Sequence, residues 1–412
     1  MSQVLLLSIP SHGHMNPLMG LADELINQGE EVIFFSSEEF KKSIEELGAA
    51  FKCYKEDLNI FQKKEEKPNG NLSEKKPLTG LASALLHPEI FIDDVLNQIQ
   101  ELKFDYIIFS AAYPYANLIA QILQLPAVSS FAVFATKNDL FDKKSTNTEN
   151  APKKGPFGLS PEIIQQFQKV RENLIIKYKI EVPEDMMNLF FNKGDLNIIY
   201  TSKYFIKNIK NYDDSFIFIG PPIYKKKYNV DFPFDKIEGK KVIYISLGTI
   251  FSNHSTALNN LFFQAFADTE YVVVMAAHKV NLSESEIPKN FIIRDYVPQL
   301  EILKHTNVAI THAGMNSIGD LLYNKIPFIS IPLGADQFFL ANRAEELGAT
   351  IVLNINTITP EMIRNAVEKV TTIPSYAGHI ATISQSFIDA GGYKKAVEEI
   401  VKLKTNKAIK NL

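Results

Sequence analysis

Two histidines, two positions apart, are the first residues of this chain that could do chemistry. They flank Gly13 in "SHGHMNP", residues 11–17, between the apolar run "VLLLSI" and the amphipathic stretch "LMGLADELINQG". A neutral histidine beside a cleft is a competent general base. From these residues alone, His14 fits a general base as well as it fits a histidine that only hydrogen-bonds the turn, whereas His12 is expected to be structural.

The local sequence predicts how His14 is presented. We expect a strand over "VLLLSI", a tight turn at Gly13, and a helix over residues 16–28 with Asn16 as its cap and Pro17 at its first position. His14 would then precede the N-terminus of this helix, whose partial positive charge disfavours a second proton on the ring. The imidazole is therefore expected to be neutral near pH 7.

Two later loops could hold an anion. In "SLGT", residues 246–249, small residues that follow an apolar run would expose backbone N–H groups, although many turns share this pattern. In "THAGMNS", residues 311–317, the side chains of His312, Asn316 and Ser317 precede a helical stretch. Together with the unpaired N–H groups of a helix N-terminus, they could surround a diphosphate.

Other function classes lack their signals. The chain has no P-loop lysine motif and no G-x-G-x-x-G after its first apolar run, which disfavours an NTP hydrolase and a dinucleotide enzyme. Its 43 basic and 47 acidic residues give a net charge of −4, so no nucleic-acid partner is expected. The single cysteine, Cys53, excludes an internal disulfide framework and favours the cytoplasm. No apolar run approaches the roughly 18 residues of a membrane span.

Short apolar runs that alternate with amphipathic stretches predict two doubly wound α/β domains, each with a parallel sheet. We expect a first domain over residues 1–219, a proline- and lysine-rich linker over 220–239, and a second domain over 240–390. One large α/β sheet is the alternative, and the linker disfavours it. A helix is also expected to begin near Glu184. Because ligands bind at the carboxyl ends of parallel strands, we expect the histidine turn and both anion loops to face an interdomain cleft.

The stretch over residues 296–337, "YVPQLEILKHTNVAITHAGMNSIGDLLYNKIPFISIPLGADQ", resembles the nucleotide-sugar signature of the UDP-dependent glycosyltransferases. The opening "PSHGHMNP" is similar to the N-terminal motif of the bacterial macrolide and flavonoid branch, and "DAGGYKKAVEEI" resembles the family's C-terminal segment. The resemblance implies a GT-B fold, with two Rossmann-like domains of which the first binds the acceptor and the second the donor. It also implies that the helix over residues 391–412 packs back on the first domain.

The resemblance assigns donor contacts by motif. Tyr296 stands where many relatives have a tryptophan that stacks on uracil, and Asp320 stands where they have a glutamate on the ribose, so this shorter side chain implies a longer or water-mediated contact. Gln299 corresponds to a ribose contact, and Asp336 with Gln337 to a pair that binds hexose hydroxyls, although "ADQ" alone fits a simple helix cap. The predicted donor site comprises Ser246, Gly248, Thr249, Tyr296, Val297, Gln299, His312, Gly314, Asn316, Ser317, Asp320, Asp336 and Gln337.

His14 aligns with the general base of the family, but its usual partner is missing. Most relatives have an aspartate at the end of the strand "DYIIFS", and this chain has Ser110. In a hydrolytic triad, neutralising the equivalent carboxylate costs about 10⁴ in rate. Three interpretations remain open: the acceptor has an acidic hydroxyl such as a phenol, another carboxylate reaches His14, or the protein is a weak or silent transferase.

We therefore expect an inverting hexosyltransferase that moves a sugar, favoured as glucose, from a UDP-sugar to a small apolar acceptor such as a phenolic, flavonoid or macrolide compound. No cofactor or metal is expected, since the chain lacks an Asp-x-Asp motif. Aromatic residues that follow strands of the first domain could line the acceptor pocket or belong to the core. These are Tyr113, Tyr115, Phe131 and Phe134. A nucleotide-sugar-binding accessory protein without turnover is the alternative, a UDP-sugar epimerase is disfavoured, and a monomer is the default.

Overall fold

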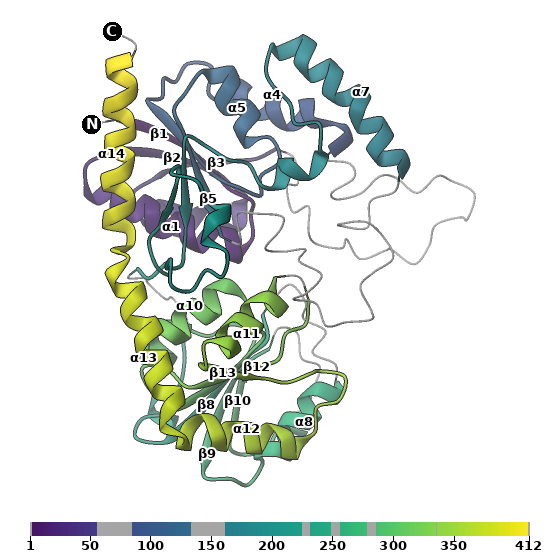
Figure 1. Ribbon diagram of the computed structural model, residues 1–412, viewed down its shortest axis with the longest axis vertical. Coiled ribbons are helices and arrows are strands. Elements are labelled where there is room, and N and C mark those ends of the chain that lie inside the picture. The colour runs from purple at the N-terminus through teal and green to yellow at the C-terminus, as the bar shows by residue number, and fades with distance from the viewer. Residues whose placement is uncertain are drawn as a thin grey trace.

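The computed structural model of the chain forms two α/β lobes that follow one another along its longest axis (Figure 1). It describes residues 2–55, 85–132, 161–224, 231–248, 256–277, 286–334 and 336–410. We call the lobe built on the first sheet the N-lobe and the lobe built on the second sheet the C-lobe. Two separate parallel sheets confirm the predicted fold class and exclude a single large sheet within the described residues.

The N-lobe sheet has seven strands in the order β3-β2-β1-β4-β5-β6-β7, and all neighbouring pairs run parallel. Its central strands β1 and β4 are apolar and buried almost throughout, as expected for strands covered on both faces. The strands are β1 (Gln3–Leu7), β2 (Glu31–Ser36), β3 (Ala50–Cys53), β4 (Tyr106–Ser110), β5 (Ala127–Phe131), β6 (Leu196–Ile199) and β7 (Phe216–Phe218).

The C-lobe sheet has six parallel strands in the order β10-β9-β8-β11-β12-β13. Numbered within the lobe, this order is 3-2-1-4-5-6, which is that of a dinucleotide-binding sheet. Its topological switch point lies between β8 and β11, where such folds bind their ligands. The strands are β8 (Lys241–Ser246), β9 (Tyr271–Ala276), β10 (Phe291–Arg294), β11 (Val308–Thr311), β12 (Phe328–Ser330) and β13 (Thr350–Val352).

Helices surround both sheets (Figure 1). In the N-lobe these are α1 (His12–Asn27), α2 (Lys41–Glu45), α4 (Pro88–Gln98), α5 (Ala116–Leu123) and α7 (Pro161–Tyr178). The C-lobe has α8 (Thr256–Phe266), α9 (Gln299–Leu303), α10 (Met315–Tyr323), α11 (Gln337–Glu346), α12 (Pro360–Thr372) and α13 (Pro374–Asp389). The last described helix is α14 (Gly392–Lys410), and short 3-10 turns cover 38–40, 186–190, 209–211 and 234–236.

The chain passes from the N-lobe to the C-lobe between β7 and β8 and returns between α13 and α14. Figure 1 shows α13 beside the C-lobe and α14 beside the N-lobe, where α14 packs against α1 and β6. The Tyr393 hydroxyl donates to the Pro17 carbonyl of α1 at 2.9 Å, and Gly20 leaves the space that this ring occupies. The last strand of the N-lobe sheet ends at Phe218, and the first strand of the C-lobe sheet begins at Lys241. The domain boundaries at residues 219, 239 and 390 stay predictions.

The helix that follows β1 begins earlier than the sequence predicts. It starts at His12, with Ser11 as its extended N-cap residue, so Asn16 is not the cap and Pro17 lies inside the helix rather than at its first position. The prediction was wrong because Pro17 lies inside the helix although it has no N–H to donate to the Gly13 carbonyl. That carbonyl accepts instead from Asn316 of the C-lobe. The helix expected from Glu184 is also wrong: residues 186–190 form a 3-10 turn that the Asp185 side chain caps.

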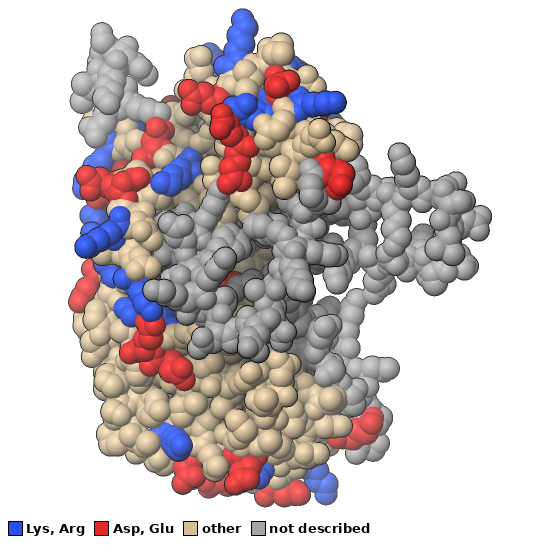
Figure 2. Space-filling view, turned by 45° about the vertical axis from the view of Figure 1, so that its right-hand side comes forward, with Lys and Arg blue, Asp and Glu red and all other residues tan. Residues whose placement is uncertain are grey.

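Charged side chains are mixed on the surface. Figure 2 shows Lys and Arg side chains interspersed with Asp and Glu side chains on one face of the molecule. This pattern agrees with the near-balanced composition and gives no single-sign stripe on the described part of that face. Among the described helices, none combines the length and the apolar character that crossing a bilayer requires.

Candidate active site between the lobes

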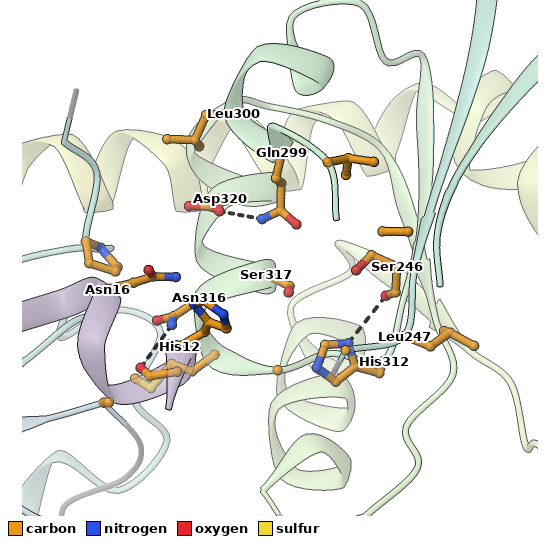
Figure 3. Close-up of a pocket in the computed structure, with 18 of the residues that line it drawn as sticks. His12, Asn16, Ser246, Leu247, Gln299, Leu300, His312, Asn316, Ser317 and Asp320 are labelled. Atoms are coloured by element: carbon orange, nitrogen blue, oxygen red, sulfur yellow. Dashed lines mark hydrogen bonds between the residues drawn. The ribbon is translucent and has the colours of Figure 1, made fainter. Parts of the chain in front are cut away.

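A cavity of about 310 Å³ lies between the lobes and collects most of the predicted site residues (Figure 3). The N-lobe contributes the first turn of α1, which directly follows β1. The C-lobe contributes the loops after β8, β10 and β11 and the start of α11. These are carboxyl ends of parallel strands, as the sequence predicts.

His14 borders this cavity and contacts Ser110, which is buried and is not one of the residues that border it. The Nδ1 atom of His14 lies 2.9 Å from Oγ of Ser110, because β1 and β4 are neighbours in the sheet and end side by side. Burial lowers the pKa of the His14 imidazole to about 4, so the ring is neutral near pH 7. When Nδ1–H donates to Ser110, the lone pair is on Nε2, which is the arrangement a general base needs.

His12 also borders the cavity, although the sequence predicts a structural role for it. Its ring lies 6.1 Å from the ring of Tyr296 and 5.2 Å from that of Phe40, measured between centroids. Its Nε2 lies 3.8 Å from a carboxylate oxygen of Glu39, and both side chains are exposed. Tyr296 is 41% exposed, and an exposed aromatic side chain at a cavity wall can stack on a planar base.

The turn between β11 and α10 gathers the residues predicted to bind diphosphate. His312, Asn316 and Ser317 all border the cavity, and the N-cap residue of α10 is Gly314, which has no side chain to cap the helix. Its first N–H groups are therefore suited to an anion. Ala313 has a positive φ of 67°, a strained conformation that is common at functional sites.

Two glycines make room for the His312 ring. A Cβ atom on Gly248 would lie 2.8 Å from Nε2 of His312, and one on Gly314 would lie 2.5 Å from the same atom. Gly248 also has a φ of 81°, which other residues rarely adopt. The Nδ1 atom of His312 lies 3.3 Å from the Ser246 carbonyl oxygen, which orients the ring so that Nε2 is turned toward these glycines.

A chain of hydrogen bonds holds the predicted ribose-binding carboxylate. Gln299 donates through Nε2 to Oδ2 of Asp320 at 2.6 Å (Figure 3), and the Tyr244 hydroxyl donates to Oε1 of Gln299 at 2.9 Å. Tyr244 fixes which end of the Gln299 amide faces the carboxylate. Sequence reasoning missed Tyr244, because a tyrosine inside an apolar strand gives no signal that its hydroxyl reaches a site.

Asp336 and Gln337 lie at the start of α11 and border the cavity. Burial raises the pKa of the Asp336 carboxyl to about 6, and its side chain makes no capping bond, which argues against the simple-cap alternative. Gln337 accepts through Oε1 from the backbone N–H groups of Leu333 and Gly334, at 2.8 and 3.1 Å. Its oxygen therefore shapes the loop, and its amide nitrogen is the part that can contact a ligand.

The remaining predictions divide into three groups. Ser246, Gly248 and Val297 border the cavity as predicted for donor contacts. Thr249 and Phe134 lie outside the described residues. The structure buries three of the aromatic candidates, Tyr113, Tyr115 and Phe131, in hydrophobic clusters and does not bring them into the described cavity, so their role as acceptor contacts stays a prediction. Over the described ranges, no group of three or more His, Cys, Asp or Glu residues could hold a metal ion.

Comparisons with known proteins agree with this geometry. The family model for UDP-glucoronosyl and UDP-glucosyl transferases matches residues 234–391. The chain is 33% identical over 414 residues to YojK of Bacillus subtilis (strain 168), which is described as an uncharacterized UDP-glucosyltransferase, with 99% of this chain and 100% of that protein covered. It is 31% identical to NDP-glycosyltransferase YjiC of Bacillus licheniformis, with 96% of both covered.

Solved structures share the whole fold. The glycotransferase of kitacinnamycin superposes with a TM-score of 0.78 at 20% identity, over 98% of this chain and 99% of that one. CalG4, the calicheamicin glycosyltransferase, gives 0.75 at 22% identity, with 98% of both chains covered. The two lobes therefore form a GT-B fold, and the chain belongs to the bacterial UDP-glycosyltransferase family. It is a glycosyltransferase that uses a UDP-sugar.

Proposed function

We propose that the protein is an inverting, metal-independent glucosyltransferase that transfers glucose from UDP-glucose to a hydroxyl of a small apolar acceptor, such as a phenolic, flavonoid or macrolide compound. The observation that carries this proposal is the position of His14. A neutral imidazole in the first turn of α1 and the α10 N-terminus border one cavity. The description of YojK as a UDP-glucosyltransferase supports glucose as the sugar.

The proposed reaction is one in-line displacement. Nε2 of His14 takes the proton of the acceptor hydroxyl while its oxygen attacks the anomeric carbon. The bond between that carbon and the diphosphate oxygen breaks on the opposite side, and the electron pair leaves with UDP, so the configuration inverts. His312, Ser317 and the first N–H groups of α10 would stabilise the departing charge electrostatically.

The donor would be held along the C-lobe wall. The exposed Tyr296 ring would stack on uracil, and Asp320, oriented by Gln299, would accept from the ribose hydroxyls. Asp336 and the amide nitrogen of Gln337 would contact the hexose hydroxyls. A fixed and negatively charged Asp320 favours a donor with both ribose hydroxyls.

Ser110 bears on which acceptor is used. Because serine carries no charge, the imidazolium formed during transfer gains no ion-pair stabilisation from this neighbour. A base whose conjugate acid has a pKa of about 4 removes a proton best from an acidic hydroxyl. We therefore favour phenols over aliphatic alcohols. The relatives reported above are transferases by name, and none supports a binding protein without turnover.

The test is a transfer assay with UDP-glucose and matched phenols and aliphatic alcohols. We expect a β-glucoside product from α-linked UDP-glucose, read from the anomeric proton coupling. His14→Ala should lower kcat by about 10²–10⁴, the usual contribution of a general base. His12→Ala, two positions away in the same helix turn, should cost far less. Retention of configuration, or a His14→Ala variant with full activity, would contradict the proposal.

A further inference from the structure

The C-lobe contacts the helix that carries the proposed base. Nδ2 of Asn316, in the first turn of α10, donates to the carbonyl oxygen of Gly13 in the first turn of α1 at 3.1 Å (Figure 3). Gly13 is the residue immediately before His14. This hydrogen bond therefore crosses the cavity and ends one peptide unit from the proposed general base.

Pro17 explains why this carbonyl accepts a bond from another lobe. In an α-helix the carbonyl of Gly13 would accept from the N–H of residue 17, four positions on. Residue 17 is proline and has no N–H, so the helix cannot supply this bond. Asn316 takes the place of the missing donor, which is why a proline is tolerated inside α1.

The Asn316 amide has one defined orientation. Its Oδ1 atom is buried and has no hydrogen-bond partner among the residues that the structure describes, and exchanging Oδ1 with Nδ2 would set two oxygen atoms against each other at Gly13. An amide nitrogen carries two N–H groups, and Gly13 uses one of them. The second can donate to a diphosphate oxygen bound at the same turn, beside Ser317.

Contacts outside the cavity also join the lobes. The Arg343 side chain of α11 donates to the carbonyls of Phe205 and Tyr204 at 2.9 and 3.1 Å. Because such contacts already set how closely the lobes approach, the role of the Asn316–Gly13 bond is local: it joins the first turn of α1 to the first turn of α10.

We propose that Asn316 is a positioning residue: its amide nitrogen links the Gly13 carbonyl to the diphosphate turn and so fixes the distance between His14 and the departing diphosphate. The diphosphate half of this statement rests on the donor site proposed above. The contact with Gly13 is observed in the structure and does not depend on that donor site.

The test is a double-mutant cycle between Pro17→Ala and Asn316→Ala. Pro17→Ala restores an N–H inside α1 that competes for the Gly13 carbonyl and leaves the diphosphate turn untouched. We expect it to lower kcat about 3- to 10-fold while the Kd for UDP changes less than twofold. Asn316→Ala should lower kcat more and weaken UDP binding, and Pro17→Ala should add no loss in that background. Wild-type kcat in Pro17→Ala, or losses that multiply in the double variant, would overturn the proposal.

Tyr393→Phe is the matched control. It removes a different hydrogen bond to α1, from the Tyr393 hydroxyl to the Pro17 carbonyl, and this residue does not border the cavity. Its kcat should match the wild type. A loss as large as that of Pro17→Ala would mean that any loosening of α1 lowers activity, which would overturn the proposal. Thermal melts identify variants that fail to fold.

A second readout separates this proposal from the donor site. In the protein without added UDP or sugar, hydrogen exchange of the backbone N–H groups at the start of α1 should be faster in Asn316→Ala than in the wild type and in Tyr393→Phe, because only Asn316→Ala removes the bond to Gly13. If the wild type neither binds UDP nor transfers glucose, the proposed function fails, and this difference in exchange can still be measured. Equal exchange at the start of α1 in all three proteins would overturn the positioning role.

Discussion

Ser110 and His14 form a pair in which neither side chain carries a charge near pH 7. The resemblance to the family leads one to expect an aspartate in place of Ser110, and a carboxylate there would raise the pKa of the ring by favouring the imidazolium. With serine, burial dominates and the pKa falls to about 4. The sequence predicts that Ser110 takes the place of the aspartate and that the His14 ring is neutral. It could not predict how deeply the ring is buried, which sets its pKa, because that burial depends on packing from several elements.

The first residue-scale prediction concerns pH. Because the folded pKa of His14 lies below its ordinary value, the ring stays neutral until the pH falls to about 4, and kcat with a phenol should hold from pH 8 to pH 5. In Ser110→Asp the acid limb should move up by at least one pH unit, and the rate with an aliphatic alcohol should rise.

These profiles should be measured at saturating UDP-glucose. The pKa of Asp336 is raised to about 6, so its protonation at lower pH would weaken donor binding and appear in KM. Ser110→Ala, which removes the hydroxyl without adding charge, is the control. An acid limb that stays in place in Ser110→Asp would show that His14 is not the titrating base.

At the scale of elements, the anion site depends on the turns that follow β8 and β11. His312 lies between Gly248 and Gly314, each too close to the ring for a side chain, and Gly248 has a left-handed backbone. The sequence indicates small residues in both turns. It could not show that the His312 ring from the second turn packs against a glycine in the first, since His312 comes 64 positions after Gly248 along the chain.

Gly248→Ala tests this packing. The added Cβ would strain the backbone at φ 81° and displace the His312 ring, so we expect the Kd for UDP to rise at least tenfold, measured by calorimetry. Gly378→Ala is the matched control, because its Cβ meets nothing within 4 Å and it lies within α13. The same loss of affinity in both variants would contradict the role given to Gly248.

Element boundaries show what the sequence could and could not predict. The strands "EVIFFS" and "YIIFS" have the predicted bounds, because their consecutive apolar residues are typical of a buried parallel strand. The strand "AVSSF" also has the predicted bounds, although two of its five residues are serines. The start of α1 was predicted five residues too late, with Pro17 instead of His12 as the first helical residue. The preference of proline for the first helical position placed Pro17 there. The hydrogen bond that replaces its missing N–H inside the helix comes from Asn316 in the other lobe, which a local rule cannot include.

At the scale of the whole molecule, the site is a product of how the two lobes face each other. Alternating apolar and amphipathic segments predict two doubly wound units, and the motifs predict most of the residues that border the cavity. The contacts that join the lobes were not predicted. His12 with Tyr296 and Asn316 with Gly13 bring together residues about 300 positions apart, and neither member of such a pair carries a local signal for the other.

The central claim is that His14 and the α10 N-terminus face one reaction centre. A crystal structure of the protein with UDP and a phenolic acceptor tests it most directly. The account predicts the diphosphate against Ser317 and the first N–H groups of α10, with the acceptor oxygen in hydrogen-bonding reach of Nε2 of His14. A diphosphate bound elsewhere, or an acceptor hydroxyl turned away from His14, would contradict it.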